Sequence, residues 1–68
     1  MVSDKYVMLY VGMEFTSQWF EGVVEVLNID APKNELLVVI SRPMGYHQED
    51  WNLEHTITGF KNGDYIRK

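Results

Sequence analysis

The residues best suited to hold a metal ion lie close together in the second half of the chain. They are two histidines and two carboxylates, at His47, Glu49, Asp50 and His55. Imidazole and carboxylate groups are common ligands of zinc and other divalent ions. The spacing of these residues matches no known ligand motif, and an acidic polar segment is usually a solvated surface. We therefore expect an exposed polar loop followed by a helix start, with no metal and no cofactor.

Residue types that support catalysis are sparse. The chain contains no cysteine, no Gly-Xaa-Ser-Xaa-Gly motif and no glycine-rich phosphate loop. No serine has a histidine as a near neighbour in the sequence. Pairing two of Glu14, Glu21 and Glu25 as a glycosidase dyad would be arbitrary, because carboxylates on strands are usually solvated. The sequence therefore predicts a protein that is not an enzyme.

Aromatic residues provide the best candidate for a binding surface. Such side chains can line a peptide groove, form a cage around a methylated cation or stack on single-stranded bases. Phe20 and one tryptophan are expected in the core, and the sequence leaves open which tryptophan that is. The predicted partner-contact surface consists of Tyr46, His47, Trp51 and Trp19. An aromatic centre with an acidic rim is typical of a protein-binding hot spot rather than of a phosphate site.

The elements that position these residues centre on a β-hairpin. Residues 22–30 (GVVEVLNID) and 35–42 (ELLVVISR) are rich in valine, leucine and isoleucine. Residues 31–34 between them contain a proline and an asparagine, both of which favour turns. This pattern predicts two antiparallel strands joined by a tight connection, and it sets the class of the chain as mostly β.

The first strand of this hairpin is expected to be long, running from about Trp19 to Ile29. Its apolar residues fall on both faces of the strand. One face carries Phe20, Val24 and Val26, and the other carries Trp19, Val23, Leu27 and Ile29. Two apolar faces suit a strongly curled strand that packs against a barrel on one side and a helix or partner on the other. Gly22 is the expected bend or bulge point.

Shorter segments flank the hairpin. Residues 6–11 (YVMLYV) and 14–16 are predicted strands, and residues 1–4 are expected to be frayed. Pro43 is expected to end the returning strand, because proline has no N–H to donate within a sheet. Residues 44–50 (MGYHQED) are polar, which predicts an exposed loop.

Two interpretations fit the tail of the chain. A helix near residues 51–61 would have Asp50 as its N-cap, an apolar stripe along one side and Asn62-Gly63 as a left-handed C-cap. The stripe consists of Leu53, Ile57 and Phe60. A hairpin would instead use Asn62-Gly63 as a type I′ turn after the β-branched residues 56–58. The helix is favoured because its stripe and both of its ends agree, and both interpretations close with a strand at residues 65–67.

Length and composition limit the class of protein. The 68 residues predict a single small β-rich domain over residues 1–68. The chain has no cysteine for a disulfide or a thiolate zinc site, which favours an intracellular, cytoplasmic protein. No apolar run is long enough for a membrane span, so no membrane partner is expected. The net charge of −4 weighs against nucleic acid as a partner, because phosphate binding needs a basic face.

The order of motifs resembles that of small uncharacterised proteins of bacteria, phages and mobile elements. The motifs are VGMEF at residues 11–15, WFEGVVEVLNID at 19–30, ELLVVIS at 35–41 and WNLEHTITGFKNGDY at 51–65. The resemblance implies an SH3-like or Tudor-like barrel with a helix that begins at a tryptophan and a closing Gly-Asp-Tyr strand. KOW and Tudor modules of this architecture bind RNA or modified peptides. This chain departs from the first in its acidity and from the second in lacking a recognisable aromatic cage.

We therefore expect a mostly β, small α+β domain, built as a curled antiparallel sheet or SH3-like barrel of about four to five strands with one short helix near residues 51–61. The predicted core is Val11, Phe15, Phe20, Val24, Val26, Leu36, Val38, Ile40, Leu53, Ile57, Phe60 and Ile66. The expected function is that of a non-catalytic module that binds another protein or itself, with a homodimer as one form. A nucleic-acid-binding accessory domain is the alternative.

Overall fold

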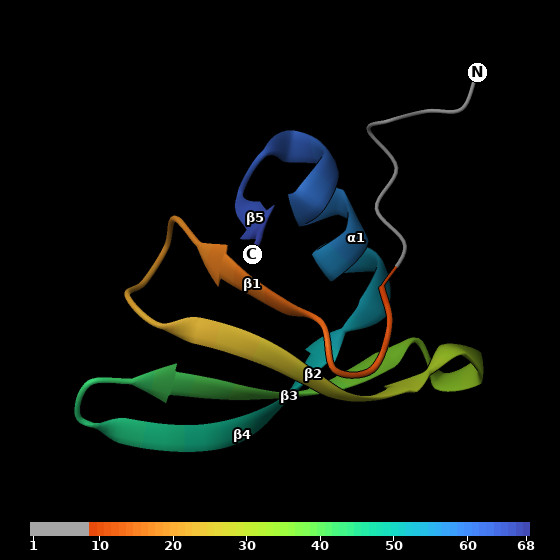
Figure 1. Ribbon diagram of the computed structural model, residues 1–68. Coiled ribbons are helices and arrows are strands. Elements are labelled where there is room, and N and C mark those ends of the chain that lie inside the picture. Colours follow the sequence, from red (N-terminus) through yellow and green to blue (C-terminus); the bar gives the residue numbers. More distant parts are fainter. Residues whose placement is uncertain (1–8) are drawn as a thin grey trace.

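The computed structural model describes residues 9–68 as one antiparallel sheet of five strands with a short helix against one face (Figure 1). The elements are β1 (Glu14–Ser17), β2 (Val23–Asp30), the 3-10 turn η1 (Ala31–Lys33), β3 (Glu35–Arg42), β4 (Gly45–Asn52), α1 (Leu53–Asn62) and β5 (Tyr65–Arg67). The strand order β4-β3-β2-β1-β5 leaves β4 and β5 at the two edges, so the sheet is curled but not closed. The expected mostly β class with one short helix is confirmed.

The predicted N-terminal elements are only partly covered. Residues 1–4, expected to be frayed, and residues 6–8 of the predicted first strand lie outside the described residues. Residues 9–11 are not in a strand, so this part of the prediction is wrong. Instead, the chain turns here, and the N–H of Met13 donates to the carbonyl of Tyr10 at 3.1 Å.

The central hairpin forms as expected from β2 and β3. The Asp30 carboxylate accepts a hydrogen bond from the Lys33 N–H at 3.4 Å, and so caps the connecting turn η1. Asn34 then adopts a left-handed conformation with φ of 57°, which asparagine tolerates better than most residues. Pro32 and Asn34 therefore have the turn-forming roles that the sequence gives them.

A β-bulge changes the faces of β2. Val26 lies opposite Val38 and Asn28 lies opposite Leu37, so Leu27 is the extra residue. Because a bulge shifts the alternation by one position, Ile29 packs against the same core as Val26. The expected placement of these two side chains on opposite faces is wrong for this reason.

The long strand expected from Trp19 begins only at Val23. Residues 18–22 are bent, and the N–H of Trp19 donates to Ser17 Oγ at 2.9 Å. Gly22 has φ of 129°, and a Cβ there would lie 2.6 Å from the carbonyl oxygen of Ser41. The predicted bend at this glycine is confirmed, since only glycine accommodates both the dihedral angle and the close approach.

The segment after Pro43 is a strand, so the predicted loop at residues 44–50 is wrong. Pro43 ends β3 as expected, and Pro43-Met44 is a two-residue connection into β4. From there β4 pairs with β3 from Gly45, opposite Arg42, to Asn52, opposite Glu35. The side chains are exposed as predicted, but backbone pairing with the buried β3 makes this polar segment a strand.

The tail forms the helix α1, so the hairpin alternative is excluded. Its N-cap is Asn52, whose Oδ1 accepts the N–H of His55 at 2.9 Å. The expected cap, Asp50, lies in β4 opposite Leu37 and is too early in the chain. At the other end Gly63 has φ of 87° and donates its N–H to the carbonyl of Phe60, which confirms the predicted C-cap.

The buried face of α1 differs by a small rotation from the predicted stripe. Thr56, Gly59 and Phe60 are buried, whereas Ile57 is only half-buried. The Thr56 hydroxyl donates to the carbonyl of Asn52 at 2.9 Å, which satisfies this buried polar group. A Cβ at Gly59 would collide with the ring of Tyr65, so glycine lets β5 pack closely on the helix.

The core lies between α1 and one face of the sheet, with Phe15 at its centre. The buried apolar residues are Met13, Phe15, Val24, Val26, Leu36, Val38, Ile40 and Phe60. Leu53 and Phe20 pack against this set as expected. Val11 and Ile66 were expected in the core but are 59% and 66% exposed. Ile66 pairs with Thr16 on the outer face of the sheet, so its side chain points away from the helix.

Within residues 9–68 no helix has the length and apolar content that a bilayer crossing requires.

Candidate interaction surface

The strand β4 forms one edge of the sheet. It pairs with β3 on one side, and no strand of residues 9–68 pairs with its other side. All of its residues except Trp51 are exposed. Figure 1 shows β4 at the border of the sheet, at the opposite end from β5. Its free side therefore presents a row of main-chain groups to the surroundings.

The hydrogen bonds of Val26 show the direction in which its main-chain N–H and C=O groups point. The directions on the neighbouring strands follow from it. Its N–H donates to the carbonyl of Met13 at 3.0 Å, and its carbonyl accepts the N–H of Gly12 at 2.8 Å. Both groups of Val26 therefore point away from β3. Its opposite residue, Val38, consequently directs its main-chain groups toward β4, because hydrogen-bonded and non-bonded pairs alternate along antiparallel strands.

The same alternation continues from β3 into β4. Val38 lies opposite Glu49, which makes these two a hydrogen-bonded pair. Every second residue of β4, counted from Glu49, is bonded to β3 in this way. The residues between them direct their N–H and C=O groups off the free edge. These residues are Tyr46, Gln48 and Asp50.

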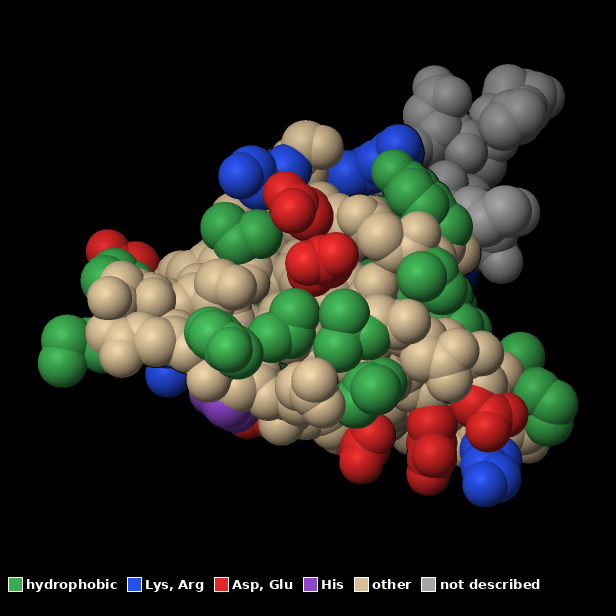
Figure 2. Space-filling view, turned by 60° about the horizontal axis from the view of Figure 1, so that its bottom comes forward, with side chains coloured by type: hydrophobic (Ala, Val, Ile, Leu, Met, Phe, Trp, Pro, Cys, Tyr) green, Lys and Arg blue, Asp and Glu red, His purple; other side chains and the backbone are tan. Residues whose placement is uncertain are grey.

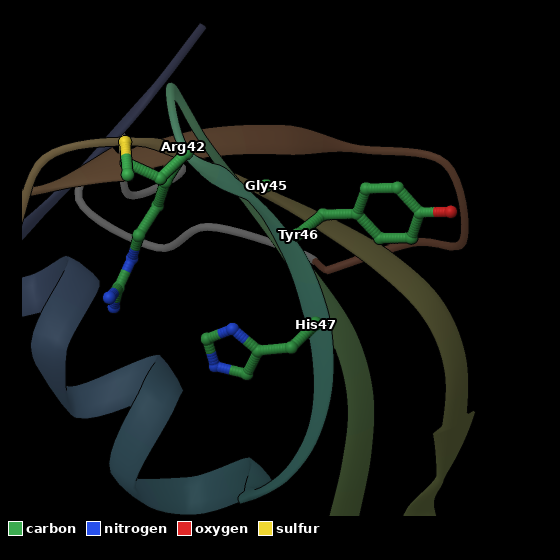
Figure 3. Close-up of a pocket in the computed structure, with 5 residues that line it drawn as sticks. Arg42, Gly45, Tyr46 and His47 are labelled. Carbon is green, nitrogen blue, oxygen red and sulfur yellow. The ribbon is translucent and has the colours of Figure 1, made fainter.

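The side chains of β4 divide between the two faces of the sheet. His47, Glu49 and Trp51 lie on the face that carries the core, opposite the buried Ile40, Val38 and Leu36. Tyr46, Gln48 and Asp50 lie on the outer face. Figure 3 shows the Tyr46 and His47 side chains pointing in opposite directions from the strand. The four predicted contact residues are therefore not one continuous patch.

A polar chain connects three neighbours on the core face of β4. The His47 ring nitrogen Nε2 lies 2.8 Å from Glu49 Oε2, and the Trp51 indole N–H donates to Glu49 Oε1 at 2.9 Å. The hydrogen bond from Trp51, followed by that from His47, lowers the pKa of Glu49 below its usual 4.5. Glu49 is thus an ionised acceptor for both neighbours near neutral pH.

Trp51 lies on the edge strand β4, and its ring packs with the aromatic rings of the core. Its ring stacks on Tyr65 at 5.7 Å with an interplanar angle of 26°, and it lies 6.1 Å from Phe15 and 6.4 Å from Phe20. Its side chain is half-buried. Trp51 is therefore the tryptophan that packs with the core, and Trp19 is the exposed one, with 67% of its surface accessible.

Two open hollows flank the tip of the β3–β4 hairpin. The larger, of 420 Å³, is lined by Phe20, Glu21, Arg42, Pro43 and Met44. The smaller, of 250 Å³, is lined by Arg42, Met44, Gly45, Tyr46 and His47 (Figure 3). Arg42 is common to both, and its guanidinium lies 5.1 Å above the Phe20 ring, at cation–π distance. These hollows add apolar and cationic contact surface beside β4.

The four residues with metal-ligand chemistry are not brought together. His47 and Glu49 are in contact, but Asp50 is on the opposite face of β4 and His55 is on α1. Within residues 9–68 no group of three or more histidine, cysteine, aspartate and glutamate side chains is placed to bind a metal. The four residues therefore do not form one ligand cluster in this part of the chain.

The outer face of the sheet is acidic beside an apolar strip. Glu14 lies directly opposite Glu25, and Lys68 Nζ is 3.9 Å from Glu14 Oε1. Val39, beside Glu25 on β3, is half-buried. Figure 2, seen from below the view of Figure 1, shows acidic side chains on two sides of a group of hydrophobic ones. Two carboxylates thus lie opposite each other on this face, one of them beside a lysine.

Comparison of the chain with protein-family models, with curated proteins and with solved structures finds no match. The resemblance to SH3-like and Tudor-like proteins therefore stays a prediction.

Proposed function

We propose that this protein is a non-catalytic interaction module that binds a partner protein along the free edge of β4. The observation that carries the proposal is the continuous pairing of β4 with β3 over eight residues, beside an outer side with which no strand of residues 9–68 pairs. An extended segment added to such an edge gains main-chain hydrogen bonds, while alternate side chains provide selectivity.

The edge lacks several of the features that commonly prevent pairing, although it carries the charged side chains Glu49 and Asp50. Proteins commonly protect edge strands with lysine, proline, a β-bulge or a short strand. Residues 45–52 contain no lysine and no proline, and their register with β3 has no shift. The opposite edge, β5, is only three residues long and is protected by its length. The proposal therefore assigns binding to β4 rather than to β5.

Side chains beside the edge add to its binding capacity. Tyr46 is 77% exposed on the outer face and lines the smaller hollow next to Arg42. Tyrosine and arginine are common in protein-binding hot spots. Glu49 and Asp50 supply negative charge on the two faces of the same strand, which favours a partner segment with positively charged or hydrogen-bond-donating side chains.

The cellular setting belongs to the same proposal. We place the module in the cytoplasm of a bacterium, in association with a phage or mobile element. This rests on the resemblance of its motifs and on a sequence without cysteine.

A tagged pull-down from source-cell lysate tests the function, with and without nuclease and at two salt concentrations. The comparison is between the wild type, Gln48→Pro and Gln48→Ala. Proline removes an N–H that points off the free edge, while alanine keeps it. We expect a protein partner that survives nuclease and salt, is retained by Gln48→Ala and is lost with Gln48→Pro. Equal recovery with both variants, or recovery that disappears with nuclease, would contradict the proposal.

A further inference from the structure

We infer that the segment bound along β4 is β4 of a second copy of this chain, paired antiparallel about a twofold axis at Gln48 to form one continuous sheet. This inference rests on the proposed function, because it takes the free edge of β4 as the binding surface. It adds the identity of the partner and the register of the pairing.

The main-chain geometry restricts the register. The groups that point off the edge belong to Tyr46, Gln48 and Asp50, so these residues must face one another across the new interface. With a twofold axis perpendicular to the sheet, the core faces of both copies lie on the same side of the joined sheet, and so do their outer faces. The axis can therefore pass through a residue of β4 such as His47, Gln48 or Glu49, but not between residues.

Charge distinguishes among these three positions. An axis at Glu49 would place two carboxylates directly opposite each other, which is unfavourable. An axis at His47 would place two imidazoles opposite each other and would leave the C-terminal end of β4 unpaired. An axis at Gln48 places His47 opposite Glu49 of the second copy, and Glu49 opposite His47 of the second copy. Only this register pairs acidic with basic side chains on the core face.

The pairing at Gln48 also suits the remaining residues of the strand. Tyr46 comes opposite Asp50 of the second copy on the outer face, where the phenol can donate to the carboxylate. Gly45 comes opposite Trp51, and an aromatic side chain across from a glycine is a favourable arrangement in sheets. Gln48 meets its own copy and contributes through its main-chain N–H and C=O groups, which an alanine would keep. The three outward residues would form about six main-chain hydrogen bonds across the interface.

His47 and Glu49 are already in contact on the face where each would meet the second copy. Both lie on the same face, 2.8 Å apart, and both are more than two-fifths exposed, at 45% and 44%. In the paired state each would keep its neighbour and gain a hydrogen-bonding partner of the other type across the interface. His47 of one copy and Glu49 of the other would form a non-hydrogen-bonded pair, in which the two Cα atoms lie about 4.5 Å apart. Their side chains are then close enough to contact each other.

Cysteine cross-linking tests the register, because the chain has no cysteine of its own. With Gln48→Cys the two Cα atoms would be about 5.5 Å apart, within the range of about 4.4–6.8 Å that disulfides require. With Tyr46→Cys alone the equivalent distance is about 13 Å, from four residues of strand rise. We expect Gln48→Cys to form a disulfide dimer under mild oxidation, and Tyr46→Cys to cross-link only when mixed with Asp50→Cys. Cross-linking of Tyr46→Cys alone, or none with Gln48→Cys, would overturn this register.

Sedimentation equilibrium tests the association itself. We expect wild type and Gln48→Ala to approach twice the 8.0 kDa of one chain as concentration rises. Gln48→Pro should weaken the dimer by about tenfold or more, because it removes main-chain bonds at the axis. His47→Glu should weaken it too, and His47→Glu/Glu49→Lys should restore it. A wild type that stays monomeric at every concentration, or a double variant as weak as the single one, would contradict the inference.

Circular dichroism of each variant shows whether its fold is intact, and a folded Gln48→Pro keeps the test valid. If wild type is monomeric yet Gln48→Pro still loses another protein from the lysate, self-pairing is wrong and the proposed function stands. If Gln48→Pro changes neither self-association nor partner recovery, both are wrong.

Discussion

The Trp51 indole donates a hydrogen bond of 2.9 Å to the carboxylate of Glu49, two residues earlier on the same strand. This contact joins the aromatic core to the polar edge of the sheet, since Trp51 also stacks on Tyr65. Glu49 in turn contacts His47 at 2.8 Å. The conformation of the edge strand β4 is therefore coupled to the packing of the core.

Replacing Glu49 should cost a modest amount of stability. Glu49→Ala removes the acceptor of two hydrogen bonds, and we expect a loss of about 0.5–1 kcal/mol, limited by the exposure of the contacts. The measurement is the free energy of urea unfolding. Asp50→Ala is the matched control, because its side chain is on the outer face, and it should change stability by less than about 0.5 kcal/mol. Equal losses in the two variants would refute a specific role for Glu49.

Lowering the pH should reduce the stability of the fold by protonating the Glu49 carboxylate. Its pKa is lowered in the folded state, chiefly by the hydrogen bond from Trp51, so the ionised form is favoured there. This contribution is complete above the usual value of 4.5 and is lost as the pH falls through the lower folded-state value. Urea titrations across this range should show a smaller pH dependence for Glu49→Gln than for wild type. An unchanged dependence would contradict the expected linkage.

Raising the pH into the alkaline range should reduce the stability of the fold through the phenol of Tyr65. Burial, and secondarily the charge of Asp64, raises the pKa of its phenol above the usual 10.0. The unfolded chain therefore loses this proton first, and stability falls as the pH rises past that value. Tyr65→Phe should remove part of the alkaline destabilisation. Tyrosinate absorbance and thermal unfolding at increasing pH provide the measurement.

A methyl group at Gly59 should destabilise the fold even though alanine favours helices. The Cβ would enter the space of the Tyr65 ring, and such overpacking typically costs about 1–3 kcal/mol. The gain in helix propensity, at most about 1 kcal/mol, offsets only part of this. His55→Ala, exposed on the same helix, is the control. If Gly59→Ala has a higher unfolding temperature than the control, the Tyr65 ring moves away from the added methyl group at little energetic cost.

The two tryptophans should respond differently to truncation. Trp51→Ala removes a half-buried ring that contacts Phe15 and Tyr65, and we expect a loss of about 2–3 kcal/mol. Trp19→Ala should change stability by less than about 0.5 kcal/mol, because this side chain is largely exposed. Denaturant unfolding of the two variants tests the assignment, and the reverse order would show that the core and surface roles are exchanged.

Local patterns were enough to predict the elements with strong sequence signals. The apolar runs of β2 and β3, the turn at Pro32 and Asn34, and the helix end at Gly63 all follow from short-range preferences. The buried side chains of β3 follow from simple alternation. These parts of the fold need no information about distant contacts.

The edge strand β4 was not predictable in the same way. Residues 45–52 are polar at almost every position, so no apolar alternation marks them as a strand. Pairing with β3 determines their conformation, and that is a tertiary effect. The bulge at Leu27 is also invisible in the sequence pattern, and it moves Ile29 to the core face. The signal that was available is the two-residue connection Pro43-Met44 followed by Gly45.

Amide hydrogen exchange along β4, measured by NMR at low and high protein concentration, is the most direct test of self-pairing through this strand. His47 and Glu49 bond to β3 and should exchange slowly at both concentrations, whereas Gln48 should exchange rapidly when dilute. We expect the Gln48 N–H to become protected at high concentration, because it then bonds across the twofold axis. Rapid exchange of Gln48 at both concentrations would contradict self-pairing through this edge.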